Sequence, residues 1–370
     1  MDCGQLPSSS YSALVSRIRN SRFGAHLPLF GSFELTSRCN LKCIHCYINE
    51  KVNDCSIRED ELSTAEVFHL LDQLANAKCL SLLFTGGECL VREDFLDIYT
   101  YAKKKGILIS LYTNATLVNE TIADHLGKFR PKIVEVTIYG ATAETYEKIT
   151  GVPGSFDRCR RGIELLIKTG IHLELKTMVV KANLHELEEM KEFAREKGLR
   201  FRYDPVLSLR IGQGDLPGKQ RISPAQIAQI EQLDEKKAKE WKRLGENFLT
   251  VSSKPEYLYQ CGAGKNFFHI NAAGKLSACL VAREPSFDLR QGSFRSGWEN
   301  FIPEVLSQKW HNSSPCQECE INVFCGKCPG MSQMEHGDQE ALVEYLCEIG
   351  HRRAKAFGFG NRGPFSKEYI

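Results

Sequence analysis

Six short β-rich runs, each followed by a helix-like stretch, constrain the fold of this chain more than any other feature. The runs cover residues 33–36, 81–85, 107–113, 133–139, 171–180 and 199–204. Repeated β-α units predict a parallel sheet with right-handed crossovers. A closed barrel of this kind has eight units, so six units predict an α/β fold, a partial (β/α)6 TIM-like barrel that is open on one side. Its active site is expected at the carboxyl ends of the strands.

The helix-like stretches between the runs are amphipathic. The clearest cover 63–77 and 184–198. In the second, Leu187, Met190 and Phe193 recur three residues apart, with charged residues on the other faces. This spacing predicts helices with one apolar face.

The pattern changes after residue 205. Residues 208–224 contain several glycines and read as a linker or mobile loop, and residues 225–245 predict one helix. A small β-hairpin is expected at 266–279, where Asn-Ala-Ala-Gly-Lys supplies the turn. The last thirty residues predict a terminal helix that contains Cys347. We expect four parts: an N-terminal extension over 1–30, a barrel over 31–205, a linker and helix over 206–255, and a cysteine-rich domain over 256–370.

Composition sets the broad class of the protein. The chain has 370 residues, of which 42% are hydrophobic and 25% charged, as is ordinary for a globular protein. A formal net charge of +2 gives no reason to expect nucleic acid or an anionic membrane as a partner. The sequence has no apolar run of about 18 residues and no apolar signal core at its start. It therefore predicts a cytoplasmic protein with no membrane span.

Fifteen cysteines are a high number for such a chain. In a reducing compartment, thiols serve as metal ligands or buried side chains more often than as disulfides. Three cysteines lie within 39–46, and seven lie between Cys261 and Cys347. The other five are scattered: Cys3, Cys55, Cys79, Cys89 and Cys159. The two cysteine-rich zones are therefore the candidates for metal binding.

The first zone directly follows the first strand, at the predicted catalytic end of the barrel. Cys39, Cys43 and Cys46 form the pattern C-x3-C-x2-C. His45 could complete a four-coordinate zinc site, but it adjoins Cys46, and neighbouring residues rarely both reach one tetrahedral ion. Iron–sulfur clusters are held by thiolates, normally four of them. With only three thiolates, one iron keeps an exchangeable position.

The spacing of this motif and its place after the first strand resemble the radical S-adenosylmethionine (radical SAM) superfamily. In that family the open iron of a [4Fe–4S] cluster binds the amino and carboxylate groups of S-adenosylmethionine. One-electron reduction of the cofactor gives methionine and a 5′-deoxyadenosyl radical, which abstracts hydrogen from an unactivated carbon. The resemblance implies that Cys39, Cys43 and Cys46 hold the cluster.

The resemblance also implies cofactor contacts, mostly at the ends of the following strands. The implied residues are Gly86, Gly87, Glu88, Thr113, Asn114, Thr137, Lys176, His45 and Tyr47. The Gly-Gly-Glu stretch matches the family's contact to the methionyl amino group, and Thr113 with Asn114 matches its contact to ribose and carboxylate. Taken alone, Gly-Gly-Glu would be a turn, but its place at a strand end favours the functional interpretation. The residues of the later strands are, taken alone, more often satisfied strand ends, and His45 and Tyr47 could simply shield the cluster. Cys89 stands where the family usually has proline and reads as a small apolar filler.

The second cysteine zone resembles the SPASM extension of radical SAM enzymes, which holds auxiliary [4Fe–4S] clusters. Its core pattern is C-x2-C-x5-C-x2-C, whereas a zinc ribbon typically has about 15–20 residues between its two knuckles. By position, the resemblance assigns Cys316, Cys319, Cys325 and Cys347 to one cluster. It assigns Cys261, Cys279 and Cys328 to another.

The chain departs from the fullest form of this pattern in two places. No cysteine lies in the stretch SSKPEYLYQ before Cys261, so we expect the cluster there to have three protein ligands or to be smaller. Our hypothesis is that its open iron takes a substrate group such as a thiolate. Leu280 stands where sulfatase-maturing relatives have an aspartate base, which disfavours formylglycine formation.

The resemblance favours a peptide or protein substrate, because most relatives with this extension cross-link or oxidise ribosomally made peptides. An open barrel suits a chain-like substrate. No spare N-terminal domain of about eighty residues is present to recognise a leader peptide, so a separate recognition partner is expected. The resemblance further implies an electron donor of the flavodoxin or ferredoxin type.

Two rival functions stay open at this point. The first keeps the radical chemistry, with a small-molecule substrate such as a tetrapyrrole or an aminosugar. The second is a non-enzymatic metal-binding or electron-transfer protein, which leaves the Gly-Gly-Glu strand end unexplained.

Overall fold

The computed structural model describes residues 26–48, 50–51, 55–211, 216–248, 256–311 and 314–360. Residues 1–25, most of the predicted N-terminal extension, lie outside the described residues. The four-part division of the chain stays a prediction. Among the described helices, none combines the length and apolar character needed to cross a bilayer.

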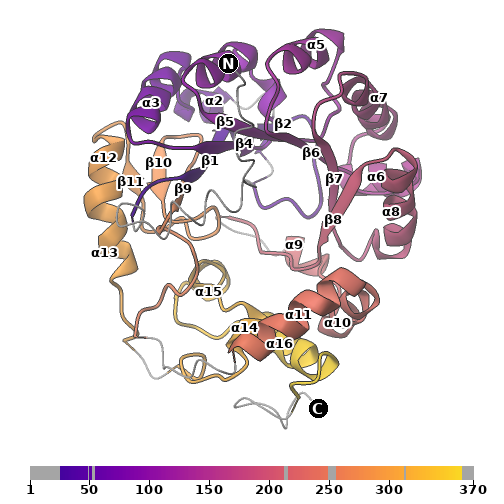
Figure 1. The fold of residues 1–370 in the computed structure, drawn as a ribbon, viewed down its shortest axis with the longest axis vertical. Coiled ribbons are helices and arrows are strands. Elements are labelled where there is room, and N and C mark those ends of the chain that lie inside the picture. Colours follow the sequence, from indigo (N-terminus) through magenta and orange to yellow (C-terminus); the bar gives the residue numbers. More distant parts are fainter. Residues whose placement is uncertain are drawn as a thin grey trace, which may run out of the picture.

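All six predicted strands are present and lie side by side in one parallel array (Figure 1). They are β1 (Phe30–Thr36), β4 (Ser81–Gly86), β5 (Leu108–Thr113), β6 (Ile133–Thr137), β7 (Leu173–Met178) and β8 (Arg200–Asp204). Each pairs in parallel with the next along the chain. The partial barrel expected from six β-α units is therefore confirmed.

Helices cover the outer side of this array (Figure 1). They are α3 (Thr64–Asn76), α4 (Phe95–Lys104), α5 (Glu120–Lys128), α6 (Ala143–Thr150), α7 (Ser155–Lys168) and α8 (Leu187–Glu196), with short 3-10 turns at Cys89–Val91 and Leu184–Glu186. Between β1 and α3 lie β2 (Arg38–Cys39), β3 (Glu50–Lys51) and α2 (Cys55–Asp60). The two helices predicted most clearly correspond to α3 and α8.

The two faces of the sheet differ in chemistry. Leu111, Val136 and Leu175 are fully buried in the apolar core. Alternating with them are polar side chains such as Tyr112 and Glu135, which are register partners and so share a face. Parallel strands covered on both faces are usually apolar throughout. This alternation therefore leaves a polar concave face inside the barrel.

The predicted hairpin over 266–279 is present, as β9 (Phe267–Ile270) and β10 (Lys275–Ser277). It is more than a local hairpin, because β9 pairs in parallel with β1 and β11 (Phe287–Asp288) pairs with β10. The sheet therefore has nine strands, and the edge at β1 is covered by a segment from the C-terminal region. Sequence periodicity cannot detect such a pairing, since the two strands are far apart along the chain.

The single helix predicted over 225–245 is wrong. Two helices stand there, α10 (Pro224–Leu233) and α11 (Glu235–Phe248). Asp234 between them has extended backbone, and its side chain accepts hydrogen bonds from the backbone N–H groups of Lys236 and Lys237. An aspartate in this conformation ends one helix and caps the next.

The rest of the C-terminal region is mostly helical. It contains α9 (Leu216–Lys219), α12 (Phe294–Ser296), a π-turn (Gly297–Phe301), α13 (Ile302–Leu306), α14 (Asn322–Cys325), α15 (Pro329–His336) and α16 (Glu344–Ala356). The predicted terminal helix is α16. Figure 1 shows α10, α11, α14 and α16 grouped at the end of the molecule away from α3 and α5.

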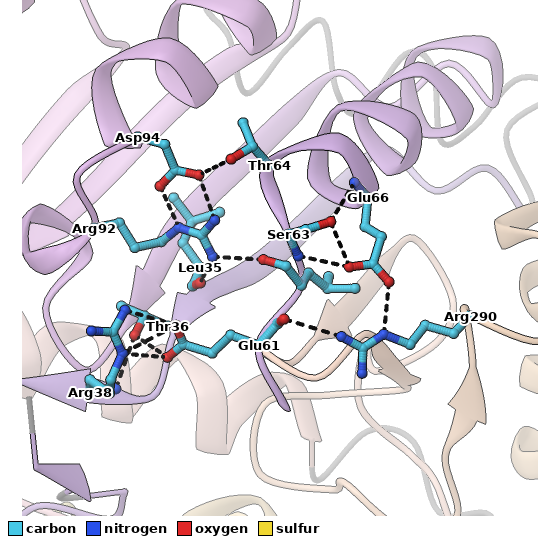
Figure 2. Close-up of polar contacts among 11 residues, drawn as sticks. Leu35, Thr36, Arg38, Glu61, Ser63, Thr64, Glu66, Arg92, Asp94 and Arg290 are labelled. Carbon is cyan, nitrogen blue, oxygen red and sulfur yellow. Dashed lines mark hydrogen bonds and ion pairs between the residues drawn. The ribbon is translucent and has the colours of Figure 1, made fainter. Parts of the chain in front are cut away.

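Buried ion pairs fix the end of β1 (Figure 2). The Arg38 guanidinium donates to both carboxylate oxygens of Glu61, at 2.9–3.2 Å, and Thr36 donates to the same carboxylate. The Arg92 guanidinium donates to the backbone carbonyls of Leu35 and Leu62, each at 3.0 Å. Together these contacts tie the end of β1 to the segments before α3 and after β4.

We expect the Arg38→Met substitution to lower the free energy of unfolding by about 3–5 kcal/mol, because it leaves the buried Glu61 carboxylate without its cation. Urea unfolding followed by circular dichroism measures the change. The matched control is Arg295→Met, whose ion pair with Glu299 is largely exposed and contributes about 1 kcal/mol or less. Equal losses in the two variants would contradict the role of the buried pair.

Candidate functional site

The loop over residues 39–46, called the cluster loop below, is hydrogen-bonded to the end of α6. The backbone N–H groups of Lys42 and Ile44 donate to the carbonyls of Thr150 and Ile149, at 2.8 and 3.0 Å. Since these carbonyls lie at the end of α6, the loop bends back over the carboxyl ends of the strands. This is the position expected for a catalytic loop in a barrel.

The three thiols of this loop lie close enough to influence one another. Burial, together with the negative charges of Glu88 and Cys46, raises the pKa of Cys39 to about 12. Burial also raises the pKa of Cys43, as do the charges of Cys46 and Cys39. Three neighbouring thiolates are therefore unstable in this site without a positively charged group. An iron–sulfur cluster supplies that charge and takes thiolate ligands, so the residues fit it.

Within the described ranges, no group of three or more Cys, His, Asp or Glu side chains is arranged to hold a single metal ion, and this holds for the three cysteines as much as for a zinc set that includes His45. The His45 ring is buried and lies 5.0 Å from the Tyr139 ring, and burial lowers the pKa of His45 to about 4. Its Nδ1 is buried without a hydrogen-bond partner, so it is a polar atom that a bound group can satisfy.

The two glycines at the end of β4 pack against the end of β1 and the start of β2, just before the loop that carries the first three cysteines. A Cβ atom on Gly86 would lie 2.1 Å from the carbonyl oxygen of Thr36, and one on Gly87 would lie 2.2 Å from that of Arg38. Gly86 also has a φ of +129°, which residues with side chains rarely adopt. The close approach for which glycine is needed is therefore to the chain's own backbone.

Glu88 serves as a hub between strands. Its buried carboxylate accepts hydrogen bonds from the Thr113 hydroxyl at 2.9 Å and from the backbone N–H groups of Asn114 and Leu90 at 2.7 and 3.1 Å. Burial raises the pKa of Glu88 to about 7, although these hydrogen bonds oppose the rise. A direct contact from this carboxylate to a cofactor stays a prediction.

Asn114 links the third strand to the cluster loop. Its side-chain N–H group donates to Asn40 at 3.0 Å and approaches the Cys39 sulfur at 3.8 Å. Its side-chain oxygen accepts from the backbone N–H of Thr116 at 2.9 Å. The structure thus brings Thr113, Asn114 and the Gly-Gly-Glu stretch together beside Cys39.

Lys176 is part of a charged cluster on the concave face. It pairs with Glu135 at 3.8 Å and lies over the Tyr112 ring, while Arg202 donates to the same Glu135 carboxylate at 2.7 Å. Burial lowers the pKa of Lys176 well below its usual range. Thr137 is the register partner of Lys176. Sequence reasoning named Lys176 and Thr137 but missed their neighbours, because their contacts run between strands.

Tyr47 connects the cluster loop to the C-terminal region. Its hydroxyl donates to Glu34 at 3.2 Å, and the Arg283 guanidinium lies 5.7 Å from its ring centroid. Glu34 is also bound by Arg283 through two N–H groups. Burial raises the pKa of Glu34, but His269 and Arg283 lower it more, to about 2. None of Glu34, His269 and Arg283 was identified from the sequence.

The four cysteines assigned to one auxiliary site are brought together. Cys316, Cys319, Cys325 and Cys347 line one cavity next to α14 and α16. Burial raises the pKa of Cys325 to about 12, and charge on the other three thiols contributes to the rise. A second set also gathers, because charge on Cys279 and Cys261 raises the pKa of Cys328, in addition to burial.

Tyr259 is a further residue that sequence reasoning missed. Its pKa is raised by burial and by the charges of Cys328, Cys261 and Cys279, which places its ring beside the second set. Its hydroxyl is buried without a hydrogen-bond partner. By contrast, Cys79, Cys89 and Cys159 are buried in the apolar core, which agrees with reading Cys89 as an apolar filler. Cys3 and the Cys55 side chain lie outside the described residues.

Comparison of the chain with known proteins points to one enzyme superfamily. A model of the radical SAM superfamily matches residues 33–194. The chain is 29% identical to an AdoMet-dependent heme synthase of Methanosarcina barkeri over 333 residues, which cover 84% of this chain and 94% of the relative. It is 27% identical to the antilisterial bacteriocin subtilosin biosynthesis protein AlbA of Bacillus subtilis over 319 residues, covering 82% and 67%.

The fold is shared with SuiB of Streptococcus suis, whose crystal structure with the precursor peptide SuiA superposes with a TM-score of 0.65. The superposition covers 87% of this chain and 76% of SuiB, at 17% sequence identity. The radical SAM family implies a [4Fe–4S] cluster and S-adenosylmethionine as cofactors, and the three coupled thiols after β1 fit that cluster. Residues 33–194 of the chain therefore form a radical SAM domain, which a cysteine-rich C-terminal region follows.

Proposed function

We propose that this enzyme abstracts a hydrogen atom from a substrate held at the concave face of the sheet, between the cluster loop and the C-terminal cysteine region. The observation that carries the proposal is the set of three neighbouring thiols after β1, of which Cys43 is buried and Cys39 and Cys46 are partly buried. When bound, the cluster and S-adenosylmethionine supply a 5′-deoxyadenosyl radical. The chain binds, orients and excludes water.

Cys39, Cys43 and Cys46 hold the cluster in this proposal. Gly86 and Gly87 bring the β4 backbone to the methionyl end of the cofactor, and Glu88 sets that backbone in place through Thr113 and Asn114. His45, which has an unsatisfied ring nitrogen, and Tyr47 lie on either side of Cys46 and face the adenine. Thr137 and Lys176 contact the cofactor from β6 and β7. An electron donor of the flavodoxin or ferredoxin type completes the system.

The Cys43→Ala substitution tests the cluster. Anaerobically reconstituted wild type, given S-adenosylmethionine and dithionite, is expected to release 5′-deoxyadenosine, which liquid chromatography quantifies. Cys43→Ala is expected to release none above background, because a [4Fe–4S] cluster with two protein thiolates is not retained. The control is Cys159→Ala, which removes a buried thiol of the core. Equal release by wild type and Cys43→Ala would overturn the proposed function.

The C-terminal cysteines hold auxiliary clusters in this proposal. Cys316, Cys319, Cys325 and Cys347 hold one cluster completely, and the shared cavity of these four side chains supports that assignment. Cys261, Cys279 and Cys328 hold another, for which three thiolates and the orphaned Tyr259 hydroxyl are available.

Iron content tests the auxiliary clusters. We expect Cys325→Ala to contain about four fewer irons per chain than wild type, since a cubane cluster has four iron atoms. Plasma emission analysis of the reconstituted proteins gives the ratio of iron to protein. The control is Cys89→Ala, because Cys89 is a fully buried cysteine of the barrel core and belongs to neither C-terminal cysteine set. Loss of the same amount of iron from both variants would count against a cluster at Cys325.

A peptide or protein is the substrate that we favour. Support comes from the bacteriocin biosynthesis protein AlbA and from SuiB, which was crystallised with a precursor peptide. A separate protein would recognise the leader of such a peptide. The second candidate is a tetrapyrrole, which a specific observation supports: the heme synthase match extends over 94% of that relative.

Mass spectrometry distinguishes the two candidates. Wild type is incubated with S-adenosylmethionine and reductant, once with the short peptides encoded beside its gene and once with iron coproporphyrin III. We expect a loss of hydrogen or a new cross-link on a peptide, and 5′-deoxyadenosine in proportion to product. A mass change on the tetrapyrrole with none on any peptide would overturn the peptide assignment. Cys43→Ala serves as the inactive control in both reactions.

A further inference from the structure

A cavity of about 440 Å³ lies where the barrel meets the C-terminal region. Its wall includes Arg210 from the segment after β8, residues of the β9–β10 hairpin, the segment around Arg283, and Met334 from α15. Cys279 lies two residues before the lining residue Val281, and Cys328 lies two before the lining residue Gly330. The cavity therefore borders the second set of C-terminal cysteines.

The cavity also extends toward the first cluster loop. A second cavity of about 210 Å³ shares Ile211, Asn271 and Arg283 with it and is lined by Ser37 and Ile48, which flank the loop. Tyr47, next to Cys46, contacts the Glu34–Arg283 pair in the wall between the two cavities. A molecule in the larger cavity would thus lie between the two cysteine sites, in the place proposed for the substrate.

The wall of the larger cavity presents cations whose carboxylate partners are not among its lining residues, although Glu34 lines the smaller cavity beside it. Arg283 lines the cavity with 17% of its side chain exposed, whereas its partner Glu34 is 2% exposed and does not line it. Lys275 also lines the cavity, and its partner Asp288 does not. Arg210 adds a third cation. Among the described lining residues, Glu284 is the only carboxylate, and it is exposed to solvent.

The Arg283 guanidinium has N–H groups that its hydrogen bonds to the described residues do not use. Three of the five N–H groups of a guanidinium are used, two on Glu34 and one on the carbonyl of Leu280. Two N–H groups are left for a molecule in the cavity. Because guanidinium donors match the two oxygens of a carboxylate, the arrangement is suited to an acidic ligand.

A buried histidine supplies the second, independent observation. His269 is completely buried and lines the cavity, and the Oγ atom of Ser32 holds its Nδ1 at 2.8 Å. Its Nε2 has no hydrogen-bond partner and lies 3.7 Å from the nearest Glu34 oxygen, which is too long for a hydrogen bond. A buried polar atom without a partner is costly, and a ligand oxygen in the cavity would satisfy it.

We propose that this cavity binds a carboxylate of the substrate, with Arg283 and Arg210 as its cationic partners and His269 as a hydrogen-bonding partner. The inference rests on the proposed function, since it assigns the cavity to that enzyme's substrate. A propionate of a tetrapyrrole and an acidic group of a peptide offer the same chemistry. The inference therefore names the carboxylate, and the experiment separates the two sources.

Binding to matched pairs of probes tests the site on the full, anaerobically reconstituted chain. The first pair is coproporphyrin III and its tetramethyl ester, followed by porphyrin fluorescence. The second is a fluorescein-labelled hexapeptide library made with free C-terminal carboxylates and again with carboxamides, followed by anisotropy. We expect wild type to bind the free acid about ten to a hundred times more tightly than the blocked form in one arm, as charge-assisted hydrogen bonds contribute that much.

Substitutions of the cavity residues show which side chains cause the preference for the free acid. Arg210→Gln is expected to weaken binding of the free acid about tenfold and leave binding of the blocked form unchanged. Arg283→Gln alone would leave Glu34 buried without its cation, so the double variant Glu34→Gln/Arg283→Gln removes both charges together. It is expected to weaken binding of the free acid about tenfold as well, because Arg210 is kept, and to leave binding of the blocked form unchanged. Arg295→Gln, on the exposed side of α12, serves as the control and is expected to match wild type.

Selectivity for coproporphyrin alone assigns the carboxylate to a tetrapyrrole, and selectivity for the peptide library alone assigns it to a peptide. Equal affinity for free and blocked probes in both arms, or no binding in either, would overturn the inference. The inference would also be overturned if Arg210→Gln and the double variant both kept the full wild-type preference for the free acid over the blocked form. Release of 5′-deoxyadenosine by wild type without substrate is measured separately, so that failure of the radical chemistry is distinguished from failure of the carboxylate site.

Discussion

The carboxyl end of β1 is the constraint on which the site depends. Within residues 34–38 the chain holds Arg283 through Glu34 and holds Glu61 through Thr36 and Arg38. The same five residues supply the carbonyls against which Gly86 and Gly87 pack. Because each buried charge needs its partner, the cluster loop takes its place only when segments from across the chain have assembled around this strand end.

The strands and the cysteine sets could be predicted because their signals lie in short stretches of the sequence. The six strands were located because alternation and β-rich composition are local, and their parallel order follows from the short helical connections. The thiols of each predicted set lie close enough to influence one another, because the spacing of thiols along the chain limits which of them can meet, and their role as cluster ligands stays a prediction. The resemblance to the radical SAM superfamily is confirmed by the comparisons, but the cofactor contacts are not tested by them.

What could not be predicted depends on contacts between distant segments. Nothing in the sequence near Phe267 indicates that β9 pairs with β1. Glu34, His269 and Arg283 are single charged or polar residues in ordinary strands and turns, and only the tertiary fold places them together. The break at Asp234 was missed for a different reason, since aspartate occurs both within helices and at their starts, and the choice depends on packing.

The parallel pairing of β9 with β1 has a consequence for how the chain is made. Phe30 aligns with Phe267, so the strand synthesised first among those described acquires its second neighbour only after most of the polypeptide has left the ribosome. Until then one edge of the nascent sheet offers unpaired N–H and C=O groups, to which another chain can add. Nascent chains of this protein therefore depend on early protection of the β1 edge, by a chaperone or by rapid completion of synthesis.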